Sequence, residues 1–208
     1  GGRFGLLKNQ LRGEMNLFYF RLANALVVRK DSSNADYYVN AGHTRQQGAE
    51  LSLSYQHFFS RAGSFWQSLS VRTAQSYYYF VYGDYQKGSA RYDGNYLPSV
   101  PAYTLSVVAS LQSRPGLFLQ ATCYAASKIY LTDDNSVSAP AYQVLGARFG
   151  WRFHSPKCGW QVYGGADNLL DEAYSLGNDI NAAAGRYYNA APGRNYYIGL
   201  RWDFNQKK

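Results

Sequence analysis

The chain has few charged residues, no long apolar run and little sulfur, and each shortage excludes a class of protein. Charged residues make up 16% of its 208 residues, against about 25% in average soluble domains. No stretch approaches the roughly 18 apolar residues of a membrane-spanning helix. Aromatic residues are abundant instead, at 17%, with 21 tyrosines. Because the mean hydropathy is nevertheless below zero, the composition favours membrane strands with one apolar and one wet face.

The sequence also has no obvious cluster of basic, metal-binding or catalytic residues. The net charge is +8, but the basic residues are scattered singly, so we predict no nucleic-acid partner. Cys123 and Cys158 lack metal-ligand spacing, and the sequence leaves open whether they are unpaired or joined in a disulfide. His43, His57 and His154 lie in separate segments without a nucleophile beside them. We therefore expect no enzyme, no cofactor and no metal site.

Apolar and polar residues alternate along most of the chain. The pattern is clearest in the last segment, where large apolar residues occupy every second position from Tyr196 to Phe204. Alternation with a period of two predicts strands, and we count about nine. The segments 45–59, 65–80, 101–113, 116–130 and 141–154 exceed the roughly 5–6 residues of a typical globular strand. A tilted membrane strand needs about 9–11 residues.

The connections between these segments alternate in length. The short ones are residues 10–13, 60–64, 113–116 and 154–157, and the long ones are 30–44, 82–100, 131–140 and 171–193. Up-and-down barrels of the outer membrane have short periplasmic turns and long external loops, whereas a soluble sandwich has no reason to keep that order. We therefore predict an all-β, antiparallel up-and-down transmembrane β-barrel with its C-terminus in the periplasm. Because the chain starts at Gly1 without an initiator Met or an apolar signal core, we expect a mature or internal piece of a protein.

The alternation assigns residues to two faces. In the segment 18–22, we expect Phe18, Phe20 and Leu22 to face outward and Tyr19 and Arg21 to face inward. The residues predicted to face the barrel lumen are Arg21, Glu50, Arg72, Arg148, Arg152, Asp167, Arg201 and Asp203.

Four segments resemble, in the right order, the C-terminal part of TonB-dependent outer-membrane receptors. They are NAGHTRQQGAELSLSYQ (40–56), LPSVPAY (97–103), GADNLLDEAYS (165–175) and GRYYNAAPGRNYYIGLRWDF (185–204). The third departs from the family pattern, with Leu170 where Phe is usual. The ferric siderophore receptors look most similar, through NDINAAAGRYYNAAPGRN.

This resemblance implies a 22-strand barrel with a plug in its lumen, of which residues 1–208 would supply about nine C-terminal strands. No plug domain is visible in the sequence, and the TonB complex would contact the missing N-terminal region. The lumen arginines could pair with plug carboxylates or with carboxylates of their own wall. Outer-membrane lipid and lipopolysaccharide would surround the barrel. The barrel assembly machinery would recognise the last strand as an insertion signal, through Tyr196, Ile198, Leu200, Trp202 and Phe204. The family pattern usually ends on the aromatic residue, whereas four residues follow Phe204 here.

The resemblance also implies active import of a ferric siderophore across a Gram-negative outer membrane, energised through TonB. Arginine charge and tyrosine stacking would suit an anionic, aryl-bearing ligand. The external-loop candidates are Tyr82, Tyr85, Tyr92, Tyr96, Arg186, Tyr187, Tyr188 and Arg194. Arg186 and Arg194 could equally order their own loop or meet lipopolysaccharide phosphates. The alternatives are a small self-closed porin or adhesin, a secreted β-sandwich lectin, and a receptor for haem, cobalamin, a nickel chelate or a glycan.

Overall fold

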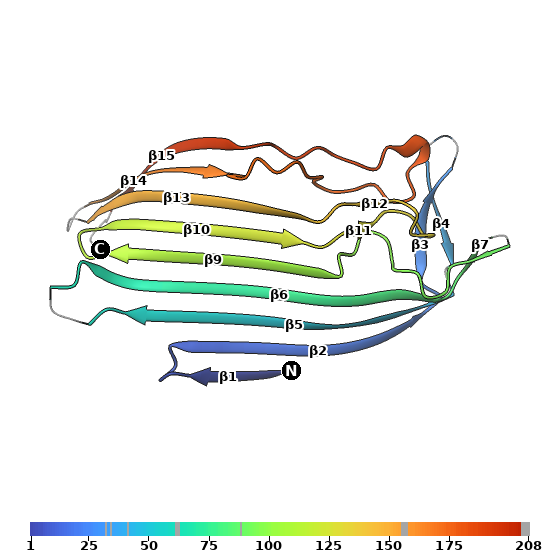
Figure 1. Ribbon diagram of the computed structural model, residues 1–208, viewed down its shortest axis with the longest axis horizontal. Helices are drawn as coiled ribbons and strands as arrows, with labels where there is room; N and C mark the ends of the chain where they lie inside the picture. Colours follow the sequence, from blue (N-terminus) through green and yellow to red (C-terminus); the bar gives the residue numbers. More distant parts are fainter. Residues whose placement is uncertain are drawn as a thin grey trace.

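Nine strands form one antiparallel sheet in chain order (Figure 1). The computed structural model describes all residues except 32, 34, 41, 61, 62, 88, 155–157 and 205–208. The strands of the sheet are β1 (Gly2–Leu6), β2 (Leu11–Ala23), β5 (His43–Phe58), β6 (Trp66–Asp84), β9 (Tyr103–Ser113), β10 (Leu117–Ala126), β13 (Tyr142–His154), β14 (Cys158–Asp167) and β15 (Asn195–Phe204). The predicted all-β, antiparallel up-and-down arrangement is confirmed.

In the nine-stranded sheet, every strand after β1 is long enough to cross a membrane. β10, β14 and β15 have 10 residues each, and β6 has 19. All eight of these strands meet the roughly 9–11 residues that a tilted membrane strand needs. No helix within the described residues is long and apolar enough to span a membrane.

Short turns lie at one end of the sheet and long loops at the other, as Figure 1 shows at its left and right. The long loops contain the small hairpins β3 (Leu26–Lys30) with β4 (Asp36–Asn40), β7 (Gln86–Lys87) with β8 (Ala90–Arg91), and β11 (Ile129–Tyr130) with β12 (Ser138–Ala139). The β14–β15 loop contains a short 3-10 helix, Ala183–Gly185. The predicted alternation of short and long connections is therefore confirmed.

The first short turn differs from the prediction by a few residues. It occupies residues 7–10 rather than 10–13, and the Gln10 amide donates to the Leu7 carbonyl. Leu7, Lys8 and Asn9 all have positive φ angles. This left-handed run turns the chain without a glycine, so the sequence contains no strong turn signal at this point.

The register places large apolar side chains on one face of the sheet, here called the apolar face. Ile198, Leu17 and Phe149 on this face are 84%, 66% and 65% exposed. Leu119 lies opposite Leu111 on β9 and Phe149 on β13, so the apolar surface continues across strands. An apolar surface of this extent requires a partner or a lipid environment. The opposite face, here called the polar face, contains Glu50, Arg72, Arg148 and Arg201.

The structure reverses the predicted faces in β2. Phe18 lies opposite Gly48, and therefore on the polar face with Glu50, two residues further along β5. Arg21 lies opposite Arg45, on the apolar face. The cause is space, because a Cβ at Gly48 would lie 2.7 Å from the Phe18 ring. The missing side chain thus makes room for an aromatic ring on the polar face, and the prediction that Arg21 faces the lumen is wrong.

Cys123 lies within β10 and Cys158 begins β14. No disulfide joins these two described residues. Of the two readings that the sequence left open, the structure has the cysteines unbridged.

Candidate functional site

A buried carboxylate, Asp133, ties the long loops together. Its side chain accepts hydrogen bonds from the hydroxyls of Tyr82, at 2.8 Å, and Tyr85, at 3.1 Å. The Asn181 amide donates a third, at 3.1 Å. These donors come from the end of β6, the loop after it and the β14–β15 loop. Asp133 is only 4% exposed, so the three donors offset the loss of water around its charge.

Asparagine side chains extend this network to the loop backbones. Asn135 pairs with the backbone of Tyr96 in both directions, receiving its N–H at 2.8 Å and donating to its carbonyl at 2.9 Å. Asn95 donates to the Asp133 carbonyl at 3.0 Å, and Asn181 accepts from the Asp133 amide at 3.1 Å. Hydrogen bonds therefore connect segments of the loop end that lie far apart in the sequence.

Tyr82 and Tyr85 occupy the interior of this loop end. Their exposed fractions are 1% and 2%, and their ring centroids lie 4.5 Å apart. Tyr82 and Tyr85 were predicted to contact a ligand, but in this structure burial beside Asp133 hides both rings and both hydroxyls, so neither is presented at the loop surface. Sequence reasoning missed Asp133 and Asn181, since nothing in their local spacing indicates a partner 48 residues away.

Tyr92 and Tyr187 lie on opposite loops beside a polar hollow of about 250 Å³. Its other lining residues are Lys87, Thr132, Asp133, Asp134, Ser136 and Asn181. The hydrogen bond from the Thr132 hydroxyl, supported by bonds from Ser136, lowers the pKa of Asp134 below its ordinary value. The hollow thus presents an ammonium, two carboxylates and two phenol rings. It is smaller than the roughly 300–1,000 Å³ of typical ligand pockets, so it suits one part of a larger ligand.

The other loop candidates have different surroundings. Tyr96 stacks on Tyr130, with centroids 5.5 Å apart, and is half-buried. Tyr188 is 53% exposed, and its hydroxyl donates to the Ser138 carbonyl at 3.1 Å. Arg186 is exposed at the end of the short 3-10 helix. Arg186 and Tyr188 therefore remain accessible at the loop surface.

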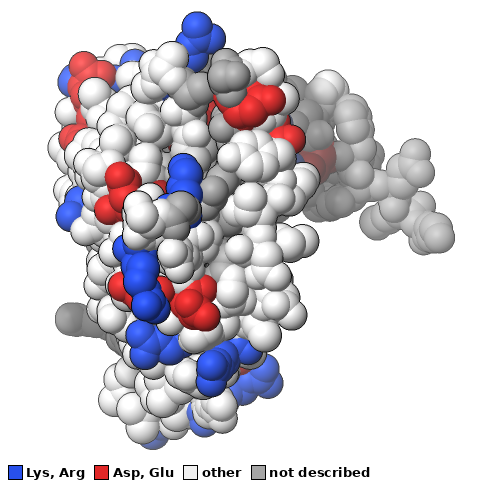
Figure 2. All heavy atoms as spheres, turned by 90° about the vertical axis from the view of Figure 1, so that its right-hand side faces the viewer, with Lys and Arg blue, Asp and Glu red and all other residues white. Residues whose placement is uncertain are grey.

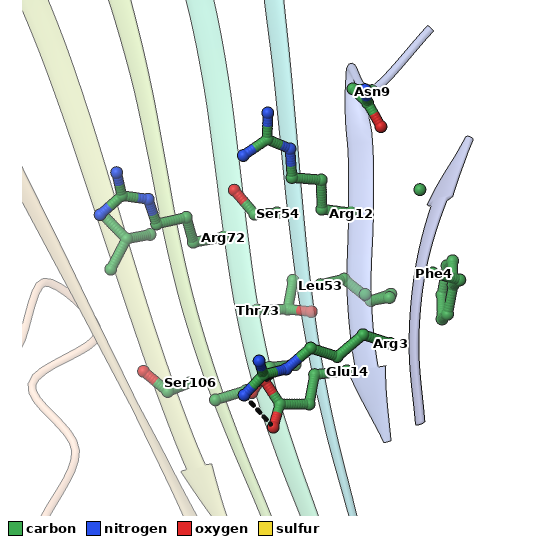
Figure 3. A pocket seen from close by; sticks show the side chains of 15 residues that line it. Arg3, Phe4, Asn9, Arg12, Glu14, Leu53, Ser54, Arg72, Thr73 and Ser106 are labelled. Atoms are coloured by element: carbon green, nitrogen blue, oxygen red, sulfur yellow. Dashed lines mark hydrogen bonds and ion pairs between the residues drawn. The ribbon is translucent and has the colours of Figure 1, made fainter. Parts of the chain in front are cut away.

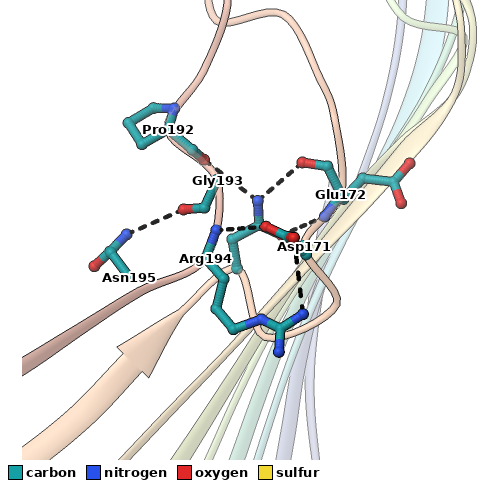
Figure 4. Close-up of polar contacts among 7 residues, drawn as sticks. Asp171, Glu172, Pro192, Gly193, Arg194 and Asn195 are labelled. Atoms are coloured by element: carbon teal, nitrogen blue, oxygen red, sulfur yellow. Dashed lines mark hydrogen bonds and ion pairs between the residues drawn. The ribbon is translucent and has the colours of Figure 1, made fainter.

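Arg194 closes the base of its own loop (Figure 4). Its backbone amide donates to Asp171 at 2.9 Å, and its guanidinium lies 3.9 Å from the same carboxylate. Beside it, the buried Asn168 side chain donates to the carbonyls of Glu172 and Pro192 and accepts from the Glu172 amide. Of the alternatives open from sequence, the structure favours the loop-ordering role for Arg194.

Figure 2 looks onto the loop end. Basic and acidic side chains lie close together on a mostly uncharged surface, without a broad field of one sign. One such contact is the ion pair between Arg91 and Asp93, at 2.6 Å. Any charge selection at this end therefore has to come from individual side chains.

Arginines on the polar face rest on aromatic rings. The guanidinium carbon of Arg148 lies 3.8 Å from the Tyr163 ring centroid, and that of Arg152 lies 4.5 Å from that of Phe118. Such stacking holds a cation in place without neutralising it. The Nε atom of Arg148 is buried and makes no hydrogen bond within the described residues.

The remaining predicted polar-face residues pair locally or stay exposed. Arg201 donates to Asp203 at 2.9 Å, and the Tyr78 hydroxyl donates to Glu50 at 2.8 Å. Asp167 and Arg72 are exposed. The register places these residues on one face, with Arg21 as the exception.

A larger hollow of about 840 Å³ opens on the polar face, mainly over β1, β2, β5 and β6 (Figure 3). Arg12 and Arg72 line it on either side of Ser54, which lies opposite both in the register. Arg3 is paired with Glu14 at 3.1 Å. Because the hollow lies over the strands of the sheet, it is a feature of the wall rather than of the loops.

The last strand presents a row of apolar residues. Tyr196, Ile198, Leu200 and Trp202 share the apolar face, and all are at least half exposed. The backbone of Phe204 lies opposite Cys158, and its side chain lies outside the described part of the chain.

Comparisons with known proteins agree with this architecture. The family described as "TonB dependent receptor-like, beta-barrel" matches residues 1–169. Among solved structures, the siderophore receptor PiuA from Acinetobacter baumannii is similar with a TM-score of 0.67 and 21% identity, over 95% of this chain and 27% of that one. The ferric citrate transporter FecA is similar with a TM-score of 0.71 and 19% identity, over 97% of this chain and 30% of FecA. The copper transporter OprC is similar with a TM-score of 0.68 and 14% identity, over 97% of this chain and 30% of OprC. The chain therefore spans less than a third of the length of these proteins, and the likeness to them shows the fold.

Proposed function

This chain belongs to the TonB dependent receptor-like β-barrel family, and from that premise we propose that it forms the C-terminal part of the wall and external loops of an outer-membrane import receptor. Its role would be that of a receptor or transporter rather than of an enzyme. The observation that carries the proposal is the long–short order of connections on a sheet with an exposed apolar face. That combination suits a wall with lipid on one side and a polar lumen on the other.

We propose the orientation of the sheet in the membrane from the same order of short and long connections. The short turns would face the periplasm together with the C-terminus, and the long loops would face the outside. The last strand, from Tyr196 to Phe204, would serve as the signal for the barrel assembly machinery. Similarity to structures more than three times as long favours a part of a larger barrel over a small self-closed porin or adhesin. We propose that the remaining strands, a plug and the TonB contact belong to the rest of the protein.

We propose a ferric siderophore as the ligand class. PiuA is a siderophore receptor and FecA a ferric citrate transporter, whereas OprC is a copper transporter on a similar fold. The choice of iron chelate over other ligands therefore has to come from the loops. Loop residues support it, because the ammonium of Lys87, the guanidinium of Arg186 and the phenol rings of Tyr187 and Tyr188 suit an anionic, aryl-bearing chelate.

The test uses the complete receptor in its own cell. Deletion should abolish growth on one ferric chelate among a defined panel, and the purified receptor should bind that chelate. Lys87→Ala combined with Tyr187→Ala should weaken binding by about tenfold or more, as expected for loss of a charge contact and a stacking ring. Tyr77→Ala on the apolar face is the matched control and should bind normally. Growth on every chelate after deletion would refute the siderophore assignment.

A further inference from the structure

Two arginines lie side by side on the apolar face at the loop end of the sheet. Arg21 on β2 is the register partner of Arg45 on β5, and both are exposed. Their Cβ atoms should be about 4.5–5.5 Å apart, and like charges directly opposite each other destabilise a sheet. Neither side chain makes a hydrogen bond or ion pair with the residues that the structure describes. An anion from outside the chain would relieve this repulsion.

Arg21 and Arg45 differ from the rest of the apolar face because they are charged. Between the short turns and the row of Arg21 and Arg45, its described residues include no other Lys, Arg, Asp or Glu. The neighbours of the pair on the same face are Tyr19, Gln47 and Val81. An otherwise uncharged surface thus ends in two adjacent cations.

The height of the pair matches the edge of a membrane. Leu11 begins β2 at the short turn, and Arg21 follows ten positions later. At about 3.3 Å per residue, this is about 33 Å along the strand. With a strand tilt of about 40°, it corresponds to about 25 Å along the membrane normal, the height of the lipid-facing apolar band of outer-membrane barrels. The guanidinium groups would therefore lie level with lipid headgroups.

We infer that Arg21 and Arg45 together clamp a phosphate group of a membrane lipid in the outer leaflet. The inference rests on the proposed orientation, in which the long loops face outward. Guanidinium groups bind phosphate oxygens through paired hydrogen bonds, and two of them on neighbouring strands can contact one phosphate from both sides. The lipid chains would then lie along the apolar face below, over Leu17 and Tyr19. The clamp would fix one lipid at a defined strand pair and height.

The test measures lipid binding to the complete receptor purified in neutral detergent. Lipid A carrying its phosphates and dephosphorylated lipid A are the two probes, with bound lipid detected by native mass spectrometry. Arg21→Gln combined with Arg45→Gln should weaken binding of phosphorylated lipid A on the order of ten- to hundredfold. Binding of dephosphorylated lipid A should not change. Inorganic phosphate at millimolar concentration should not compete, because it lacks the acyl chains that contact the apolar face.

A matched double variant controls for charge. Arg12→Gln combined with Arg72→Gln removes two arginines from the polar face of β2 and β6, and it should leave lipid A binding intact. Arg21→Lys combined with Arg45→Lys should keep part of the affinity, since lysine retains the charge without the bidentate fork. Unchanged binding in the Arg21/Arg45 variant, or an equal loss in the Arg12/Arg72 variant, would overturn the inference.

Failure here can be separated from failure of the proposed function. If chelate uptake is normal and the Arg21/Arg45 variant binds phosphorylated lipid A as the wild type does, only the lipid clamp is refuted. If no chelate is imported but lipid A binding falls in that variant alone, the clamp is supported and the import assignment is refuted.

Discussion

The hydroxyl of Tyr82 donates a hydrogen bond of 2.8 Å to Asp133, 51 residues further along the chain, and both side chains are buried. This contact joins the end of β6 to the β10–β13 loop. Through Asn181, the same carboxylate reaches the β14–β15 loop. Hydrogen bonds therefore connect the loops into one body. Lys87 and Tyr187, which line the polar hollow, belong to these connected loops.

Tyr82→Phe should loosen this body without unfolding the sheet. The substitution keeps the ring but removes one donor from a buried carboxylate, which should lower the free energy of loop opening by about 1–3 kcal/mol. Hydrogen exchange of the loop amides, such as those of Tyr92 and Asn95, should accelerate accordingly. Tyr188→Phe removes a hydroxyl from an exposed tyrosine at the same end and should have little effect. Equal exchange in the two variants would refute the anchoring role of Asp133.

The sequence predicted the sheet well because its signals are local and repeated. Alternation, strand length and the order of connections each depend on a few neighbouring residues, and together they led to the nine-strand antiparallel arrangement. The loop end could not be predicted in the same way. Tyr82 and Tyr85 read as exposed loop tyrosines, because the carboxylate that buries them lies in a different loop.

The reversed faces of β2 have a different cause. Near its loop end, β2 has large residues on both faces, with Phe18 and Phe20 on one and Leu17 and Tyr19 on the other. Alternation alone then does not decide which set is outside. Pairing with Gly48 decides it, and the Phe18 ring packs 6.0 Å from that of Tyr78 on the polar face. Only the register between strands carries this information.

Gly48→Ala should destabilise the sheet by about 1–3 kcal/mol, because an added Cβ would lie 2.7 Å from the Phe18 ring and 2.6 Å from the Tyr77 carbonyl oxygen. The backbone oxygen cannot rotate away, so the strands themselves have to move. Gly2→Ala is the control, since a Cβ there meets nothing within 4 Å. Equilibrium unfolding of the complete receptor in detergent would compare the two. Equal midpoints would show that Gly48 is not needed to seat the Phe18 ring.

Phe204→Ala should reduce assembly into the outer membrane more than deletion of residues 205–208. The last strand holds a continuous apolar row from Tyr196 to Trp202, and Phe204 continues its spacing at the end of the strand. We expect the assembly machinery to read this row, with the polar tail contributing little. Quantifying folded receptor in outer-membrane fractions would measure the effect. Equal assembled levels for Phe204→Ala and the wild type would refute the role of this residue.

Adjacent residues of β10 offer the sharpest test of which face meets lipid. Ala121 lies on the apolar face opposite Ala109 and Ala147, and Thr122 lies on the polar face opposite Val108 and Gly146. Ala121→Arg places a cation in the lipid-facing band and should cost about 2–4 kcal/mol near the bilayer midplane. Thr122→Arg adds the same charge one residue away, on the wet face, and should cost much less. Refolding into lipid vesicles, followed by denaturant titration, gives both values. A larger loss for Thr122→Arg than for Ala121→Arg would mean that the apolar face is not the one in contact with lipid.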